Sequence, residues 1–321
     1  MKKIEILYLT RKNVIDVGIT LKDAMIIAEK VLAEHQNKNY EFPPKTGVHP
    51  MSDAFLHAMP AYLPGLNTVG IKWVSVFASN TKLNVPSTMG LIILNDVNTG
   101  QPIAIMDGGY ITAQRTAAAS GVSAKYLANK DAKVMGIVGA GEQARFNLLV
   151  LTDVLKKIEL VKVYDINADT LRNYIETMGQ KVSCKIVASS SAEDVIRDTD
   201  IVVTATGALS GKPIFMEEWI KEGALVLPIH SHGWEFSALQ NASKFVVDDW
   251  PQYSTNTYYP QLPPVYAELG EIVIGKKKGR ETKSEKIVSM NWGIALHDVG
   301  LATQVLASAK ERGLGITLPY M

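Results

Sequence analysis

From residue 132 onward the chain alternates apolar runs typical of strands with amphipathic runs typical of helices. The strand-like segments AKVMGIVGAG and LVKVYDIN are followed by the helical patterns EQARFNLLVLTDVL and ADTLRNYIETMG, and the alternation continues through CKIVASS, SAEDVIRDT, DIVVTATG and GALVLPIH. Repeated βα units fold into a parallel, doubly wound sheet with helices on both faces. Ligands bind such sheets at the carboxyl ends of the strands, so this stretch predicts an α/β domain with a ligand site at that edge.

The residues before this stretch have a different pattern. Residues 20–36 carry apolar side chains at helical spacing, with Thr20 as the N-cap and Asp23 three residues later. Residues 68–78 and 87–96 read as strands. The last helical pattern, residues 294–313, has an apolar face that can pack on this first section. A chain of 321 residues suits two domains, and the first of them is predicted to be α+β.

Composition excludes several classes of partner. With 33 basic and 32 acidic side chains there is no charge excess to favour nucleic acid or an anionic membrane. The one cysteine, Cys184, cannot form an internal disulfide, which fits a reducing compartment. Glu5 and Arg11 interrupt the apolar run near the N-terminus, and no window approaches the roughly 20 apolar residues of a membrane span. We expect a cytoplasmic protein.

A glycine-rich loop lies between the first strand and the first helix of the alternating region. Gly139, Gly141 and Ala144 form G-x-G-x-x-A, in which the glycines permit a tight turn and close approach of a pyrophosphate. Asp165 ends the next strand, where a carboxylate binds the ribose hydroxyls of NAD and repels the 2′-phosphate of NADP. A purely structural turn is the alternative. We predict a Rossmann domain that binds NAD, with NADP disfavoured, through Gly139, Ala140, Gly141, Glu142, Gln143, Ala144, Asp165, Ile166, Thr204, Ala205, Thr206 and His230.

Two cations stand out in the first section. Arg115 lies near the start of a helix of small residues, where the helix dipole disfavours a cation unless an anion binds. Lys72 shares a strand face with Val74 and Val76, so it lies either on an edge strand or in a partly buried pocket with a lowered pKa. The residues alone leave open whether Arg115 is a surface side chain and whether Lys72 is an edge side chain.

Four segments together resemble the ornithine cyclodeaminase and mu-crystallin family: IKWVSVFASN, the run from STMGLIILND to SAKYLA, GIVGAGEQA, and AELGEIVIGKKKGR. The most specific feature is the arginine of TAQRTAAAS followed by GAGEQA. The resemblance covers nearly the whole chain. It implies an α/β fold in which a Rossmann domain, residues 129–293, is inserted into an α+β substrate and dimerisation domain, residues 1–128 and 294–321. It also implies a homodimer.

The resemblance further implies roles for single residues in the substrate site. Lys72 matches the family's active-site lysine, and Arg115 matches the arginine that binds the substrate carboxylate. Lys45 stands where relatives usually carry a second arginine, so a point charge replaces a bidentate fork. Thr88, or its neighbour Ser87, falls in the strand that lines the cleft.

The segment LVLPIHSHGWEF, residues 225–236, carries two histidines at the end of a predicted strand. His232 aligns with an aspartate of the cyclodeaminases, and we expect it to exchange the proton that imine chemistry requires. Glu235 could take that role if the loop bends. His230 and His232 could instead contact the cofactor or shape the pocket. We predict no metal, because alternate strand residues point apart and few other ligands cluster nearby.

Taken together, these features predict an NAD-dependent oxidoreductase, similar to ornithine cyclodeaminase, that acts on the Cα–N bond of an amino acid or its imine. Alanine dehydrogenase or cyclic ketimine reductase is the alternative within this class. A crystallin-type protein that binds a cofactor or small ligand without turnover is the alternative of another class. Nicotinamide absorbance that changes only when substrate is added would distinguish the two classes.

Overall fold

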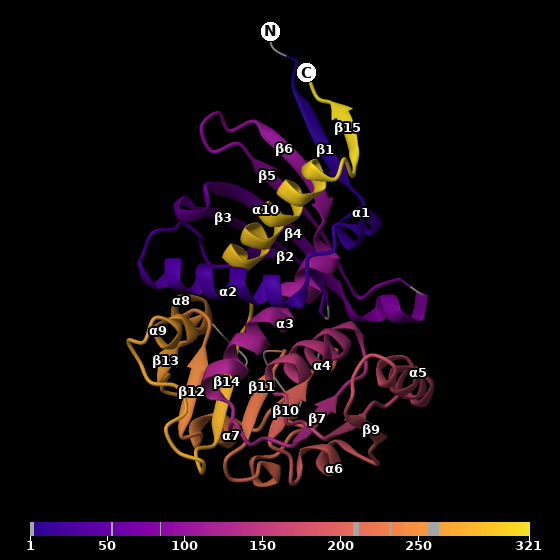
Figure 1. The fold of residues 1–321 in the computed structure, drawn as a ribbon, viewed down its shortest axis with the longest axis vertical. Helices are drawn as coiled ribbons and strands as arrows, with labels where there is room; N and C mark the ends of the chain where they lie inside the picture. The colour runs from indigo at the N-terminus through magenta and orange to yellow at the C-terminus, as the bar shows by residue number, and fades with distance from the viewer. Residues whose placement is uncertain (1–2, 53, 84, 208–211, 231–232, 256–262) are drawn as a thin grey trace. The chain divides into compact units, whose positions relative to one another are not determined.

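The computed structural model describes residues 3–52, 54–83, 85–207, 212–230, 233–255 and 263–321 (Figure 1). It divides the chain into a first unit, residues 1–115 and 293–321, and a second unit, residues 116–292. The second unit is therefore an insertion in the first. The first boundary of these units falls at Arg115, within helix α3 (Gly108–Leu127), so this helix contributes residues to both units. The predicted division into residues 1–128 plus 294–321 and residues 129–293 stays a prediction.

The first unit contains a seven-stranded mixed sheet. Its strand order is β15 (Ile316–Pro319), β1 (Glu5–Leu9), β6 (Pro102–Asp107), β5 (Thr88–Asn95), β4 (Thr68–Phe77), β3 (Ala54–Leu63) and β2 (Thr46–Met51). Among the described strands of this sheet, only the β1–β6 pair is parallel. Strand β4, which carries Lys72, pairs with β3 on one side and β5 on the other. The edge-strand interpretation of Lys72 is therefore wrong.

Helices cover one face of this sheet. Helix α10 (Ala295–Glu311) packs against β3, β4, β5 and helix α2 (Leu21–Gln36), and the short helix α1 (Arg11–Asp16) follows β1. Thr20 and Asp23 form the predicted capping box of α2. The hydroxyl oxygens of Thr68 and Thr303 lie 2.6 Å apart and link β4 to α10. The prediction that the last helix packs on the first section is confirmed.

The second unit is built on eight parallel strands. Their order is β13 (Ala267–Glu268), β12 (Lys244–Val247), β14 (Ile287–Met290), β11 (Leu225–Pro228), β10 (Ile201–Thr204), β7 (Val134–Val138), β8 (Leu160–Tyr164) and β9 (Lys185–Ala188). From β7 the chain builds outward to β8 and β9, and then crosses to β10 and β11 on the other side. The predicted α/β doubly wound class is confirmed. The crossing creates a switch point where the carboxyl ends of β7 and β10 meet.

Helices and short turns connect these strands. They are α4 (Glu142–Val154), α5 (Ala168–Gly179), α6 (Ala192–Ile196), η3 (Glu217–Trp219), α7 (Phe236–Gln240), α8 (Trp250–Ser254) and α9 (Leu269–Val273). Every residue of β10, β11, β12 and β14 is buried. Continuous burial is typical of parallel strands that are covered on both faces.

Helix α3 is buried from residue 111 to residue 124, and its small side chains permit close packing. Ser120 and Ser123 satisfy their hydroxyl groups on the carbonyl oxygens one turn earlier. The Ser123 hydroxyl also lies 3.0 Å from that of Ser289 on β14. Arg280 donates to the carbonyl of Leu127 at 2.7 Å and so caps the end of the helix. No helix among the described residues combines the length and apolar character needed to cross a membrane.

Candidate functional site

Three charged side chains meet in the interior of the first unit. Lys72 Nζ lies 2.7 Å from Asp298 Oδ2, and Arg115 Nε lies 3.0 Å from Asp298 Oδ1. The lysine and aspartate side chains are at most 1% exposed, and that of Arg115 is 9% exposed. Two cations share one anion here, so the protonated cluster carries a buried positive charge that a carboxylate ligand would neutralise.

Three elements bring these side chains together. Lys72 points to the face of the sheet that carries buried Val74 and Ile92. Thr112 and Arg115 are three residues apart on α3 and therefore share one face of that helix. The Thr112 hydroxyl accepts a long, 3.4 Å hydrogen bond from Lys72 and donates to the Gly108 carbonyl at 2.6 Å. The strand residue Lys72 is thus held by Thr112 of helix α3 and by Asp298 of helix α10.

The buried site changes the proton affinity of Lys72. Burial lowers the pKa of Lys72 to about 7, with Arg115 and Lys45 lowering it further and Asp298 opposing them. Burial raises the pKa of Asp298, but Arg115 and Lys72 outweigh burial and hold the pKa below its ordinary value. Near neutral pH the carboxylate is therefore ionised, while Lys72 exists in both forms and can give or take a proton.

Arg115 is the eighth residue of α3 and is buried, so the surface interpretation is wrong. The helix dipole acts mainly within the first turn, and the sequence argument from a helix start does not apply at this position. Its guanidinium packs against Gly293, which has a φ of +81°. A Cβ atom at residue 293 would lie 1.9 Å from Arg115 Nη1, so a glycine there leaves room for the arginine.

The other two predicted substrate contacts are Lys45 and Thr88. Lys45 directly precedes β2, and its charge contributes to the lowered pKa of Lys72 and of His57. Thr88 pairs with Val76, four residues beyond Lys72 on β4, which corresponds to about 13 Å along the strand. The structure thus brings Lys45 into the electrostatic range of Lys72 and places Thr88 farther along the sheet.

Asp298 is the residue that sequence reasoning missed. The sequence pattern predicted only that the C-terminal helix packs on the first section. Its residues 295–302, ALHDVGLA, are all buried, and Asp298 is one of them. A carboxylate within such an apolar run is a signal of a buried charge, since aspartate is almost never fully buried unless it is paired. That signal was present in the sequence, but the partners were not identifiable from it.

His297, the neighbour of Asp298, supplies a stability prediction. Neither ring nitrogen has a hydrogen-bond partner in the described part of the chain, and burial, followed by Arg115, lowers the pKa of His297 to about 3. Below its ordinary pKa of 6.5 the unfolded chain binds a proton that the folded chain refuses. Acidification should therefore cost about 1.4 kcal/mol of unfolding free energy per pH unit at this group.

We expect His297→Leu to weaken the loss of stability between pH 6.5 and pH 4, as measured by denaturant unfolding. The exposed His49 offers the control His49→Leu, which should retain the wild-type pH dependence. Equal pH dependence in wild type and His297→Leu would show that His297 does not contribute to acid sensitivity.

The glycine-rich loop of the second unit joins β7 to α4. Gly139 has a φ of +97°, and a Cβ atom there would lie 2.6 Å from the Ala205 carbonyl oxygen. Gly141 is the N-cap of α4, and a Cβ atom there would meet nothing within 4 Å. The loop therefore packs tightly at its first glycine and is open at its second. There the amide groups at the start of α4 can donate hydrogen bonds to an anion.

Asp165 and Ile166 follow β8. One oxygen of Asp165 accepts from the amide of Ala140 at 2.8 Å, and the other accepts from Asn167 at 2.8 Å. The carboxylate thus fixes the glycine-rich loop and retains lone pairs for ribose hydroxyls. Ile166 is 93% exposed, which leaves an apolar surface beside this carboxylate.

The loop after β10 and the start of α4 contain polar atoms that lack partners. Thr206 Oγ1 and Gln143 Oε1 are buried and form no hydrogen bond within the described residues. Together with the open side of Gly141, these atoms fit a ligand that is rich in hydroxyl and phosphate groups. Thr204 does not fit its predicted cofactor contact: it is fully buried, and its hydroxyl accepts from Trp234 Nε1 at 3.1 Å. It stabilises the core beneath the loop.

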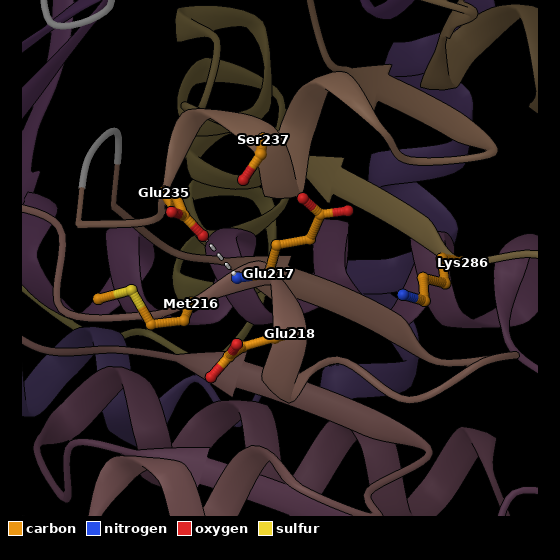
Figure 2. A pocket seen from close by; sticks show the side chains of 6 residues that line it. All are labelled: Met216, Glu217, Glu218, Glu235, Ser237 and Lys286. Atoms are coloured by element: carbon orange, nitrogen blue, oxygen red, sulfur yellow. Dashed lines mark hydrogen bonds between the residues drawn. The ribbon is translucent and has the colours of Figure 1, made fainter.

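The histidine segment is only partly described. His230 follows β11, and its ring lies 5.8 Å from that of Phe215. His232 lies outside the described residues, so its proton role and the metal alternative stay predictions. Glu235 accepts a hydrogen bond from the Glu217 amide at 3.1 Å and lines a cavity of about 570 Å³ with Met216, Glu217, Glu218, Ser237 and Lys286 (Figure 2). Its carboxylate is thus used to hold a turn.

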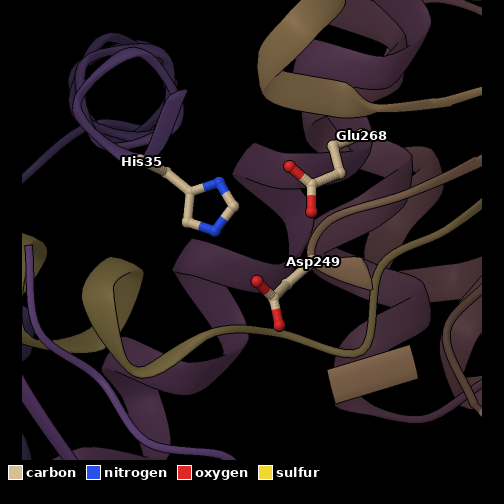
Figure 3. Close-up of side chains that lie close together, drawn as sticks. All are labelled: His35, Asp249 and Glu268. Atoms are coloured by element: carbon tan, nitrogen blue, oxygen red, sulfur yellow. The ribbon is translucent and has the colours of Figure 1, made fainter. Parts of the chain in front are cut away.

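Two further carboxylates lie at the ends of β12 and β13: Asp249 follows β12, and Glu268 is the last residue of β13. Asp249 accepts from the Gln252 amide at 2.8 Å, and Glu268 accepts from the Trp250 amide at 2.8 Å. Figure 3 shows the side chains of Asp249 and Glu268. His35, drawn in the same figure, belongs to α2 of the first unit. Asp249 is the N-cap of α8, and Glu268 is the N-cap of α9.

Comparison with known proteins shows one family over almost the whole chain. The model of the ornithine cyclodeaminase/mu-crystallin family matches residues 7–313. The nodulation efficiency protein NfeD of Rhizobium meliloti is 36% identical over 318 residues, which cover 98% of both chains.

Two solved structures agree in fold and sequence. The Thermococcus litoralis Delta(1)-pyrroline-2-carboxylate reductase in complex with NADH and L-proline is 33% identical, with a TM-score of 0.90 and coverage of 97% of this chain and 99% of that chain. An archaeal alanine dehydrogenase dimer with bound NAD is 30% identical, with a TM-score of 0.88 and coverage of 99% and 100%. The chain belongs to the ornithine cyclodeaminase/mu-crystallin family.

Proposed function

We propose that this chain is an NAD-dependent oxidoreductase that acts on the Cα–N bond of an amino acid or of its imine. The observation that carries the proposal is the buried cluster of Lys72, Asp298 and Arg115. An α-amino or α-imino acid brings a carboxylate for the arginine and a nitrogen whose protonation changes during the reaction. The reductase and the alanine dehydrogenase among the relatives act on compounds of this kind.

Each residue of the first unit has a distinct part in this proposal. Arg115 and Lys45 bind the carboxylate, the first through a planar fork and the second as a point charge. Lys72 exchanges a proton with the substrate nitrogen or with the water that adds to the imine. Thr88 contacts the end of the substrate that is remote from Arg115. His232 remains our proposal for a second proton carrier.

The second unit is proposed to hold the cofactor. NAD, when bound, supplies the acceptor for the hydride of the Cα–H bond. The open amides of the loop from Gly139 to Ala144 donate hydrogen bonds to the pyrophosphate, and the Asp165 carboxylate accepts hydrogen bonds from the ribose hydroxyls. Ile166 covers the adenine, and Ala205, Thr206 and His230 line the nicotinamide half. NADP is disfavoured because the Asp165 carboxylate would face its phosphate.

We expect Asp165→Ser to reverse part of this cofactor preference. The variant should bind NADH about tenfold more weakly and NADPH more tightly, because the carboxylate that binds ribose and repels phosphate is gone. Fluorescence titration with both dinucleotides measures the two Kd values. Asp169→Ser, which changes an exposed carboxylate in the first turn of α5, is the control. Wild type that already prefers NADPH would contradict the assignment of Asp165.

We further propose a homodimer formed through the outer face of the first unit's sheet. Trp73, Met89 and Leu91 on β4 and β5 are between 39% and 44% exposed, whereas Lys72 and Ile92 face the interior. An exposed apolar patch of this kind marks a protein interface. The archaeal alanine dehydrogenase relative is a dimer. Light scattering after size exclusion should show a dimer, and Trp73→Glu should shift it toward monomer.

The proposed function is tested with a panel of amino acids and cyclic imino acids, each with NAD(H) and NADP(H). Substrate-dependent change in nicotinamide absorbance identifies a dehydrogenase or reductase. Cyclodeamination that returns the hydride leaves absorbance unchanged and is read from product mass. Cofactor binding without any product across the panel would favour the non-catalytic binding protein and overturn the proposal.

A further inference from the structure

We propose that Asp298 is a positioning residue that sets the places of Lys72 and Arg115 in the substrate site. The inference rests on the function proposed above for these two cations. One carboxylate makes both contacts, at 2.7 Å to Lys72 Nζ and at 3.0 Å to Arg115 Nε. Each carboxylate oxygen therefore contacts a different cation.

The two cations have little else to hold them. Lysine and arginine side chains lose much rotational freedom when fixed, and two buried cations repel each other. Lys72 has one further hydrogen bond, the long contact to Thr112, and Arg115 has no other hydrogen bond to the described part of the chain. Asp298 supplies a common anchor on a buried helix, and this anchor fixes the distance between the two side chains.

The contact also sets the orientation of the guanidinium. Asp298 uses Arg115 Nε, so the fork formed by Nη1 and Nη2 remains for a bidentate carboxylate. Gly293 lies two residues before the start of α10, and any Cβ there would collide with this fork. Residues 293 and 298 thus determine where the fork lies: one leaves space for it and the other binds its opposite side.

Asp298 is also the anion of this cluster. The described charged and titratable groups that act on Lys72, Asp298 or His297 are Arg115 on α3, Lys45 before β2, and the histidines His35 on α2 and His297 on α10. All of these are cations or neutral rings. Loss of the carboxylate would remove the anion that Lys72 and Arg115 share, and Lys72 would favour its neutral form.

The test compares Asp298→Asn, which keeps the shape but removes the charge, with Asp298→Glu, which keeps the charge but displaces it. For Asp298→Asn we expect turnover to fall about 100-fold or more, since misplaced reacting groups typically cost that much. We also expect a higher KM for the amino or imino acid, an unchanged Kd for NADH, and a pH inflection moved toward acid. Asp298→Glu should restore part of the turnover and return the inflection.

Two further variants separate positioning from stability. Glu285→Gln removes a carboxylate that lies 3.0 Å from the buried Lys244 in the second unit, and it should lower the Tm without moving the pH profile. Gly293→Ala displaces the Arg115 fork without changing any charge, so it should raise KM and leave the pH inflection in place. Folded Asp298→Asn with wild-type kcat, KM and pH profile would overturn the proposal.

A direct titration keeps this result independent of the proposed function. The lysine side chains are isotope-labelled and followed by NMR, and the Lys72 signal is assigned by its loss in Lys72→Met. If the panel yields no substrate, the function fails, yet a Lys72 titration that moves at least one pH unit toward acid in Asp298→Asn and returns toward the wild-type value in Asp298→Glu still supports the positioning role. An unmoved Lys72 titration in folded Asp298→Asn contradicts it.

Discussion

Lys72→Met is expected to lower turnover of an amino or imino acid about 1,000-fold while leaving the Kd for NADH unchanged. Methionine fills a similar volume but cannot carry a proton, and loss of a positioned general acid or base costs 10²- to 10⁴-fold (about three orders of magnitude at the midpoint). Wild-type kcat/KM should change near pH 7, where burial places the pKa of Lys72, and the variant should lack this inflection. Stopped-flow nicotinamide absorbance measures both effects.

The direction of the pH effect follows from the reaction. Oxidation of an amine requires a group that accepts a proton, so activity should rise as Lys72 loses its proton above about pH 7. Reduction of an imine requires a donor, so activity in that direction should fall over the same range. Opposite slopes in the two directions are the signature of this lysine.

The chain contains a matched control for this substitution. Lys244 is also buried, at 5% exposure, and pairs with Glu281 and Glu285 in the second unit. Lys244→Met should lower the free energy of unfolding, because it removes the buried cation that contacts both carboxylates. Its turnover per folded molecule should equal that of wild type. Similar turnover losses in the two variants would mean that Lys72 acts through folding alone.

Local signals predicted much of this fold. Thr20 begins α2 because its capping box with Asp23 is complete within four residues. The alternation after residue 132 identified the parallel sheet, since each βα unit is short and the strands are buried on both faces. Features that depend on neighbours in sequence were therefore readable without the structure.

Features that depend on distant residues were not readable. The alternation of side chains along the strand showed that Lys72 shares a face with Val74 and Val76. Only the pairing of β4 with β3 and β5 shows that its strand is internal. Asp298 lies 183 residues from Arg115, so no local pattern connects them. Thr204 was placed in the cofactor site because it ends a strand, yet the distant Trp234 binds its hydroxyl.

The terminal strand illustrates the same limit. Residues 316–319 form β15, which pairs with β1 at the edge of the first sheet. Every residue of β15 is exposed, so it lacks the alternation of buried and exposed side chains that identifies a strand. Its pairing partner lies at the opposite end of the chain, and the sequence pattern alone did not indicate it.

Substitution of the two loop glycines should give different losses in the second unit. In Gly139→Ala the new Cβ meets the Ala205 carbonyl at 2.6 Å, and the φ of +97° is unfavourable for any L side chain. We expect a loss of about 1–3 kcal/mol of unfolding free energy from the backbone strain. NADH affinity should fall at least about 100-fold, because a loop that shifts can no longer direct its amides at the pyrophosphate.

Gly141→Ala separates the loss of NADH affinity from the loss of stability. Gly141 has a φ of −80°, and its Cβ would enter open space, so the folded chain should accept alanine with unchanged stability. The added methyl group would nevertheless occupy the position through which the pyrophosphate approaches, and NADH binding should weaken. Thermal unfolding and NADH titration of both variants therefore form one experiment. Unchanged NADH affinity in Gly141→Ala would place the dinucleotide elsewhere, because the open side of this loop would then not be where the phosphates bind.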